Sequence, residues 1–217
     1  VRVGRHEASV PKAAIVAAPH NRPMPRLLWL LCFVNLIIGT GAFVIGGILA
    51  PIAEQLAISV PAAGQAMTAY ALSTALLAPI VLLATGRWPR KRALLMALAL
   101  FTLGNLLCAL SNSFATLLAG RVLMGLGAVF TPIAAGIAVA VVEPAKRGKA
   151  LALTFLGISL SYVIGVPLGS WLGLAYEWHT PIWVITGLSL LALIGAAIWV
   201  PKDIQAPGAS FDGLPAL

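Results

Sequence analysis

The chain has 217 residues, of which 60% are hydrophobic and only 9% are charged. A soluble domain carries about 25% charged residues, so this composition excludes an ordinary soluble fold and indicates an integral membrane protein. The net charge of +8 would suggest nucleic acid as a partner of a soluble protein, but here the basic residues flank apolar segments, and we expect no nucleic-acid partner.

Six apolar segments follow a basic, proline-containing start, and each is close to the roughly 20 residues that cross a bilayer. They are predicted at residues 27–50, 62–85, 93–110, 114–142, 150–174 and 181–200. The flanking residues 1–26 and 201–217 are predicted to be disordered tails. The expected fold is therefore an all-α membrane protein, with a six-helix transmembrane bundle over residues 27–200.

The basic residues are distributed unevenly between the two sides of this bundle. All but one of the 14 lie before the first span, or after the second, fourth or sixth. The loops of the opposite side contain none. By the positive-inside rule, both tails are predicted to be cytoplasmic.

The exception is Arg121, which lies well inside the fourth span. A charge at this depth costs at least about 2.5–3.5 kcal/mol, and such residues usually face a bundle interior or a wet cavity. The alternative is a side chain that reaches the outer surface, but a depth of roughly 12 Å makes this difficult. No Asp or Glu lies inside any span, so Arg121 must bind backbone carbonyls, polar side chains, water or an anionic ligand.

Two further polar residues, Asn35 in the first span and Gln65 in the second, are candidates for a transport pathway together with Arg121. For each, an interhelical hydrogen bond is an equally good interpretation. Cys32 and Cys108 fall inside apolar spans and are interpreted as small buried hydrophobic residues. The chain has no CxxC motif and no Cys/His cluster, so no metal and no cofactor is expected.

Small residues recur at every fourth position of the fifth span: Gly157, Ser161, Gly165, Gly169 and Gly173. On a helix these positions share one face, and a small face in lipid allows another helix to approach closely. Pro167 lies within this ridge and predicts a bend near Val163. We expect the ridge to be a helix–helix interface.

These features resemble one half of a major facilitator superfamily transporter, in the bacterial drug and sugar efflux branch that includes arabinose efflux permease-like antiporters. Arg121, Gly125 and Gly127 are similar to the RxxxGxG motif of that family, whose Arg is linked to proton coupling. Gly165, Pro167, Gly169 and Gly173 resemble its antiporter motif in the GxPxG form. Residues 142–150 resemble its PxxRGxA connection.

The loop after the second span is similar to the GxxxDRxGRR loop of the family in its basic residues: Arg87, Arg90, Lys91 and Arg92. Gly86 stands in the acidic position, which leaves a carboxylate-based latch open to question. The first span also lacks the membrane carboxylate that many drug:proton antiporters use, so proton coupling stays open.

The resemblance implies one half of a twelve-helix fold in the inner (plasma) membrane of a bacterium, exporting small molecules such as drugs or sugars by alternating access. The resemblance also implies that the ridge of the fifth span packs against a helix of the second half. In this chain the ridge is therefore predicted to lack its partner, and to associate with another copy of the chain or with a separate second half. The alternative is a truncated, non-transporting fragment or scaffold. A membrane enzyme is disfavoured, because no histidine lies within a span.

Overall fold

The computed structural model describes residues 26–202, so the two tails predicted from the sequence lie almost entirely outside the described residues. All six predicted spans are present as helices long and apolar enough to cross a membrane. Their ends differ from the predicted ends by only a few residues. The described part of the chain is all α-helical apart from its turns, which confirms the predicted fold class.

Four of the six spans are built from more than one helical segment. The first is α1 (Arg26–Phe43) with a 3₁₀ turn, η1 (Val44–Gly47), and a short α2 (Leu49–Gln55) follows it. The second is α3 (Val60–Leu72), a π turn η2 (Ser73–Leu77) and α4 (Ala78–Ala84). The third is the continuous α5 (Arg90–Ala109). The fourth is α6 (Phe114–Gly127) and α7 (Phe130–Ala140). A 3₁₀ turn η3 (Pro144–Lys146) leads to the fifth, which is α8 (Arg147–Leu160), a π turn η4 (Ser161–Gly165) and α9 (Val166–Ala175); the sixth is the continuous α10 (His179–Trp199).

Two helix starts at the end of the bundle opposite the basic loops are capped by a serine side chain. The Ser59 hydroxyl accepts a hydrogen bond from the Ala62 amide at 3.2 Å, at the start of α3. The Ser113 hydroxyl does the same for the Thr116 amide at 3.3 Å, at the start of α6. Serine before the first turn is a preferred helix cap. Each of these serines therefore fixes the start of the helix that follows its loop.

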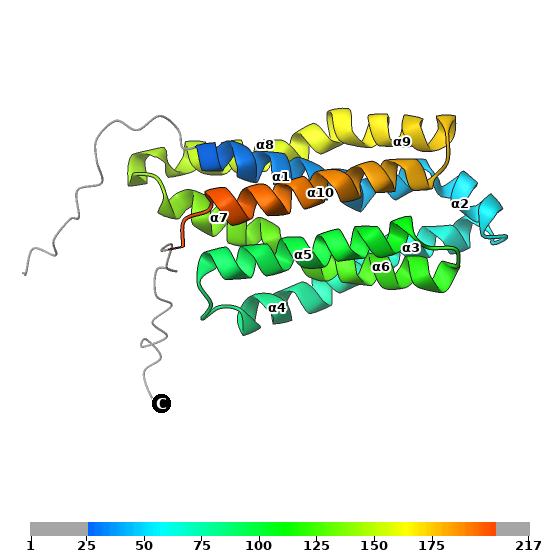
Figure 1. The fold of residues 1–217 in the computed structure, drawn as a ribbon, viewed down its shortest axis with the longest axis horizontal. Helices are drawn as coiled ribbons and strands as arrows, with labels where there is room; N and C mark the ends of the chain where they lie inside the picture. The colour runs from blue at the N-terminus through cyan, green and yellow to red at the C-terminus, as the bar shows by residue number, and fades with distance from the viewer. Residues whose placement is uncertain (1–25, 203–217) are drawn as a thin grey trace, which may run out of the picture.

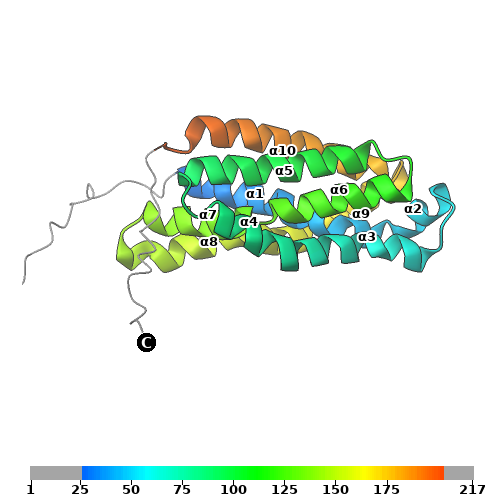
Figure 2. The same cartoon turned by 90° about the horizontal axis from the view of Figure 1, so that it is seen from below.

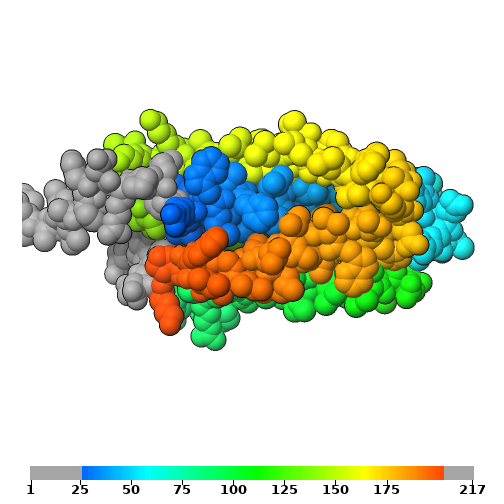
Figure 3. Space-filling model, turned by 45° about the horizontal axis from the view of Figure 1, so that its top comes forward, coloured from blue at the N-terminus to red at the C-terminus, as the bar shows by residue number. Residues whose placement is uncertain are grey.

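The bundle has α1 at its centre. This helix packs against α8 and α10, while α5 packs against α6 and α10 (Figure 1). In the perpendicular view α10 and α5 lie on one side of the bundle, and α3 and α8 lie on the opposite side (Figure 2). The space-filling view shows α1 as a strip between α8–α9 and α10 (Figure 3).

All the basic loops lie at one end of the bundle. The α4–α5 connection, the α7–α8 connection, the start of α1 and the end of α10 share this end, which is at the left of Figure 1. Short α2 and the α9–α10 connection lie at the other end. The alternation of sides inferred from the charges therefore agrees with the three-dimensional arrangement of the spans.

Candidate functional site

Arg121 is the most deeply buried charge among the described residues, with a side chain only 1% exposed. Its guanidinium donates to three backbone carbonyls: Nη1 to Gly41 at 2.8 Å, Nη2 to Ala42 at 2.6 Å and Nε to Ala66 at 3.1 Å. The first two belong to α1 and the third to α3. One side chain therefore links the fourth span to the first and the second.

The local structure of α1 explains why its carbonyls can accept hydrogen bonds from Arg121. The α-helix ends at Phe43 and a 3₁₀ turn follows, so the hydrogen-bond ladder changes its spacing beside Gly41 and Ala42. A planar guanidinium with five donors can satisfy several carbonyls at once, as a compact ammonium cannot. The sequence left backbone carbonyls, polar side chains, water or an anionic ligand as partners of Arg121. The structure shows hydrogen bonds to backbone carbonyls, and within residues 26–202 no carboxylate binds this side chain.

Tyr70 completes the surroundings of this arginine. The guanidinium carbon lies 4.8 Å from the centre of the Tyr70 ring, within the range of a cation–π interaction. The Met124 sulfur is a further, weak acceptor at 3.7 Å. Sequence reasoning missed Tyr70. The position of Tyr70 could have indicated it. Tyrosines of membrane proteins gather at the two membrane–water interfaces, whereas Tyr70 lies in the middle of a span.

The two glycines of the RxxxGxG pattern bring the fourth span close to its neighbours. A Cβ on Gly125 would lie 2.6 Å from the Cβ of Ser73, and one on Gly127 would lie 2.6 Å from the backbone nitrogen of Phe101. The Ser73 hydroxyl donates to the carbonyl of Val122 at 2.7 Å. Both glycines thus allow close backbone approach, Gly125 to the second span and Gly127 to the third.

The two polar candidates from the sequence have different surroundings. Asn35 is fully buried; its Nδ2 donates to the Thr154 carbonyl at 2.9 Å, and its Oδ1 accepts from the Thr131 hydroxyl at 3.0 Å. It therefore forms the interhelical hydrogen bonds that were one of its two interpretations. Gln65 is exposed on α3. A role for either residue in a transport pathway stays a prediction.

The ridge on the fifth span has a partner within this chain, and the prediction that it lacks one is wrong. Gly157 meets the Cys32 carbonyl and Gly165 meets Thr40, while a Cβ on Gly169 would lie 2.5 Å from Val44 and one on Gly173 would lie 2.6 Å from Ile48. Ser161 meets Gly39 and is fully buried.

The error has a physical cause. The contacted positions of the first span also recur every fourth residue, so two parallel helices align face to face along their whole length. A ridge of small residues indicates that another helix packs closely against it, but it does not indicate which helix this is. In the intact bundle this ridge faces the first span, and it is not the surface that another copy or a second half would meet.

The second and fifth spans share an interruption of their helical ladders. In each, a π turn begins at a serine, at Ser73 and at Ser161, and a proline follows it in the first turn of the next helix, at Pro79 and at Pro167. The bend predicted near Val163 thus takes the form of a π turn, since proline cannot donate to the preceding turn. π turns of this kind are frequent at functional sites.

These two spans are also the least buried by the other helices of the bundle. In the most apolar stretch of the first span 78% of the residues are buried, against 17% in the second span and 17% in the fifth. Large hydrophobic side chains are exposed along both: Leu72, Leu76, Ile80 and Leu83 in the second, and Tyr162, Val163, Leu168 and Trp171 in the fifth. The exposed Tyr162 ring lies 4.9 Å from the Phe43 ring of the first span, centre to centre.

The basic loop lies far from Arg121, at the end of the bundle. Lys91 donates to the carbonyl of Ala197 at 2.6 Å, and the guanidinium of Arg92 lies 4.6 Å from the centre of the Trp88 ring. Arg87 is exposed and Arg90 is half-buried. Within residues 26–202 no group of three or more His, Cys, Asp and Glu residues is placed to hold a metal ion.

Comparison with known proteins gives a consistent picture. The sequence profile of the Major Facilitator Superfamily matches residues 31–212. An uncharacterized MFS-type transporter of Bacillus subtilis, YbcL, is 34% identical over 168 residues, which are 77% of this chain and 43% of that protein. The inner membrane transport protein YdhP of Escherichia coli is 34% identical over 166 residues, covering 76% and 43%. A chloramphenicol resistance protein of Streptomyces lividans is 33% identical over 193 residues, covering 88% and 49%.

Solved structures agree on the fold. A crystal structure of the peptide transporter POT in complex with sulfate superposes with a TM-score of 0.69 at 18% identity, covering 80% of this chain and 37% of that one. A bacterial homologue of the human lysosomal transporter Spinster, in an inward-facing and unoccupied conformation, gives 0.69 at 18% identity, covering 88% and 47%. The chain thus spans less than half the length of each of these relatives.

Proposed function

Because this chain belongs to the Major Facilitator Superfamily, a family of membrane transporters, we propose that it supplies one six-helix half of a twelve-helix exporter of small molecules. The name of the Streptomyces lividans relative, a chloramphenicol resistance protein, supports export of a drug-like molecule. The Escherichia coli relative supports a place in the bacterial inner membrane, with both tails on the cytoplasmic side.

One observation carries this proposal: the face formed by the second and fifth spans. Both spans are 17% buried over their most apolar stretches, while Arg121 is buried among the first, second and fourth spans. In this family the substrate site lies between two six-helix halves. A second half, in the same polypeptide or in another, would cover this face and close the pathway.

The residues on this face favour a neutral substrate with apolar and hydrogen-bonding groups. The rings of Tyr70, Phe43 and Tyr162 offer apolar and polar contacts, and the Gln65 amide is exposed on α3. The six spans contain no carboxylate, so this half offers no counter-ion to a cationic substrate. If transport is coupled to protons, the carboxylate that carries them must belong to the second half.

The paired π turns support the alternating-access part of the proposal. Ser73–Leu77 and Ser161–Gly165 interrupt the two spans that face the second half. A break in the ladder is where a helix can change its direction at low cost, and rocking of one half against the other requires such points.

The test is drug accumulation in a bacterium that lacks its own drug efflux pumps. Cells make the chain alone, or the chain joined to the second half of the Streptomyces lividans relative, with chloramphenicol as the substrate. We expect the joined protein to lower the accumulation of the drug and the chain alone to leave it unchanged. Cells that make neither half are the control, and the Arg121→Ala variant of the joined protein, where it is inserted in the membrane, is expected to leave accumulation at the level of these cells.

Two outcomes would contradict this proposal. Accumulation with the joined protein as high as in cells that make neither half, although the joined protein is inserted in the membrane, would favour a non-transporting scaffold. Export by the chain alone would show that no second half is needed.

A further inference from the structure

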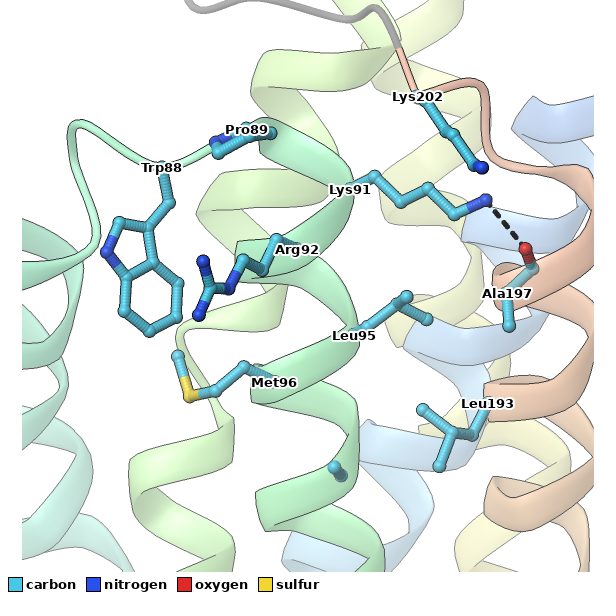
Figure 4. A pocket seen from close by; sticks show the side chains of 10 residues that line it. Trp88, Pro89, Lys91, Arg92, Leu95, Met96, Leu193, Ala197 and Lys202 are labelled. Carbon is cyan, nitrogen blue, oxygen red and sulfur yellow. Dashed lines mark hydrogen bonds between the residues drawn. The ribbon is translucent and has the colours of Figure 1, made fainter.

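A groove runs between α5 and α10, on the side of the bundle opposite α3 and α8 (Figure 2). Its volume is about 780 Å³, and it lies at the same end as the basic loops. Figure 4 shows its lining, in which the first turns of α5 and the last turns of α10 form the two walls. It is therefore separate from Arg121 and from the face proposed to meet a second half.

Three cationic side chains lie at the mouth of this groove, and its lining contains no carboxylate. Lys91 comes from the first turn of α5 and Lys202 follows the end of α10, so the two extend from opposite walls, and Arg92 lies across α5 beside Trp88 (Figure 4). Like charges that line one groove repel each other, and an anion among them turns this repulsion into attraction.

The local backbone adds to this positive potential. No side chain caps the N-terminus of α5, where Pro89 precedes the first turn. The free amides of a helix start, together with its dipole, favour an anion. On the other wall, residue 201 is a proline, so the Ala197 carbonyl has no amide donor four residues later, and Lys91 binds that carbonyl at 2.6 Å. Lys91 is thereby held at the mouth, and its ammonium group still has two protons to donate.

Below the cations the groove becomes apolar. Leu95, Met96 and Ala99 of α5 and Leu193 of α10 continue it toward the middle of the spans. From Lys91 to Ala99 the helix rises by about 12 Å, which is a substantial part of one leaflet of a bilayer. A free inorganic anion needs the cations only, whereas a lipid needs the cations and this apolar floor.

We propose that the groove binds an anionic phospholipid of the surrounding bilayer. Its phosphate lies among Lys91, Lys202 and Arg92, and an acyl chain lies along Leu95, Met96 and Leu193. Basic pockets between transmembrane helices recognise lipid headgroups by this combination of charge and depth. The bound lipid joins the third span to the sixth at the end where Lys91 alone connects them by a side-chain hydrogen bond among the described residues.

The test is native mass spectrometry of the purified chain in a neutral detergent, titrated with phosphatidylglycerol and, separately, with phosphatidylcholine. We expect phosphatidylglycerol to bind more tightly. The double variant Arg92→Gln/Lys202→Gln should weaken its binding by roughly ten- to thirty-fold, because each cation contributes on the order of 1 kcal/mol. The matched control is Arg147→Gln/Lys149→Gln, which removes the same charges from exposed positions at the same end.

A second pair of variants examines the apolar floor without altering charge. Ala99→Phe fills the groove and should also reduce binding of phosphatidylglycerol, while Leu103→Phe, one turn further along α5 and outside the groove, should not. Helix content by circular dichroism shows whether each variant is folded.

Three results would overturn the proposal. The first is equal binding of the two lipids. The second is an equal loss of binding in the groove variants and their controls. The third is full displacement of the lipid by free glycerol phosphate at the same concentration, which would assign the site to a soluble anion.

Discussion

Arg121 combines two properties that a membrane span rarely tolerates together, a full charge and complete burial. It is 1% exposed, and its donors go to carbonyls of the first and second spans. Each such charge-assisted bond is worth about 1.5–3 kcal/mol when its loss leaves a group unsatisfied. The residue thus connects three spans, and a transport role, which the RxxxGxG resemblance implies, stays a prediction.

We predict that Arg121→Ala lowers the free energy of unfolding of the chain by about 2–4 kcal/mol, because three hydrogen bonds are lost and a cavity is left, while removal of the buried charge offsets part of this loss. Arg121→Lys should be similarly destabilising, since one ammonium cannot reach carbonyls on two helices. Thermal unfolding in detergent measures both. Arg147→Ala, at an exposed position, is the control. A lysine variant as stable as the parent would mean that charge alone, and not the fork of donors, matters.

At the scale of the helix, the fifth span shows how one element can have two different faces. Its small ridge packs on the first span from Cys32 to Ile48, while Tyr162, Leu168 and Trp171 are exposed outside this ridge. The ridge therefore stabilises this half, and only the large residues remain for a second half. The π turn at Ser161–Gly165 lies between the two straight segments that carry both faces.

Enlarging a residue of the ridge should consequently lower the stability of the chain rather than change its association with other chains. Gly165→Leu places a side chain against Thr40 and is expected to cost about 1–3 kcal/mol of stability, whereas Val163→Leu, at a position that is 72% exposed, should cost almost nothing. Thermal unfolding of the two variants tests this. Equal stability of both would mean that the two spans do not meet along the ridge.

The same faces predict a difference in cross-linking, after Cys32 and Cys108 are replaced by alanine. A cysteine at Leu168 should form cross-links to any unit that covers the exposed face, whereas a cysteine at the buried Ser161 should form none. Cross-linked species separated by gel electrophoresis provide the measurement. Cross-links from position 161 to a second chain would contradict this expectation and would show that the ridge is an interface with another chain.

For the whole molecule, the distribution of charge and the arrangement of the spans agree. Every basic loop is at one end, and the opposite end carries Glu54, Glu177 and His179. We predict that reporters placed after Arg90 and after Arg147 are cytoplasmic and that one placed at Asn112 is external, because positive loops are retained inside. Enzymatic reporter fusions measure this directly. A cytoplasmic Asn112 would be incompatible with six spans.

The six spans, their alternation and the burial of Arg121 could be predicted from the sequence alone. Hydropathy and charge are properties of short stretches, and the bilayer imposes the same length on every span. The absence of carboxylates from the spans likewise left Arg121 few partners, and backbone carbonyls were among those considered.

Only the tertiary structure decided which helices these residues contact. Gly157 and Cys32 are 125 positions apart and Lys91 and Ala197 are 106 apart, and nothing local to either member of a pair specifies the other. In lipid no hydrophobic force selects among apolar faces, so close packing along the entire helix makes the choice. For this reason the ridge was visible in the sequence while its partner was not, and the basic groove between α5 and α10 exists only once the third and sixth spans lie together.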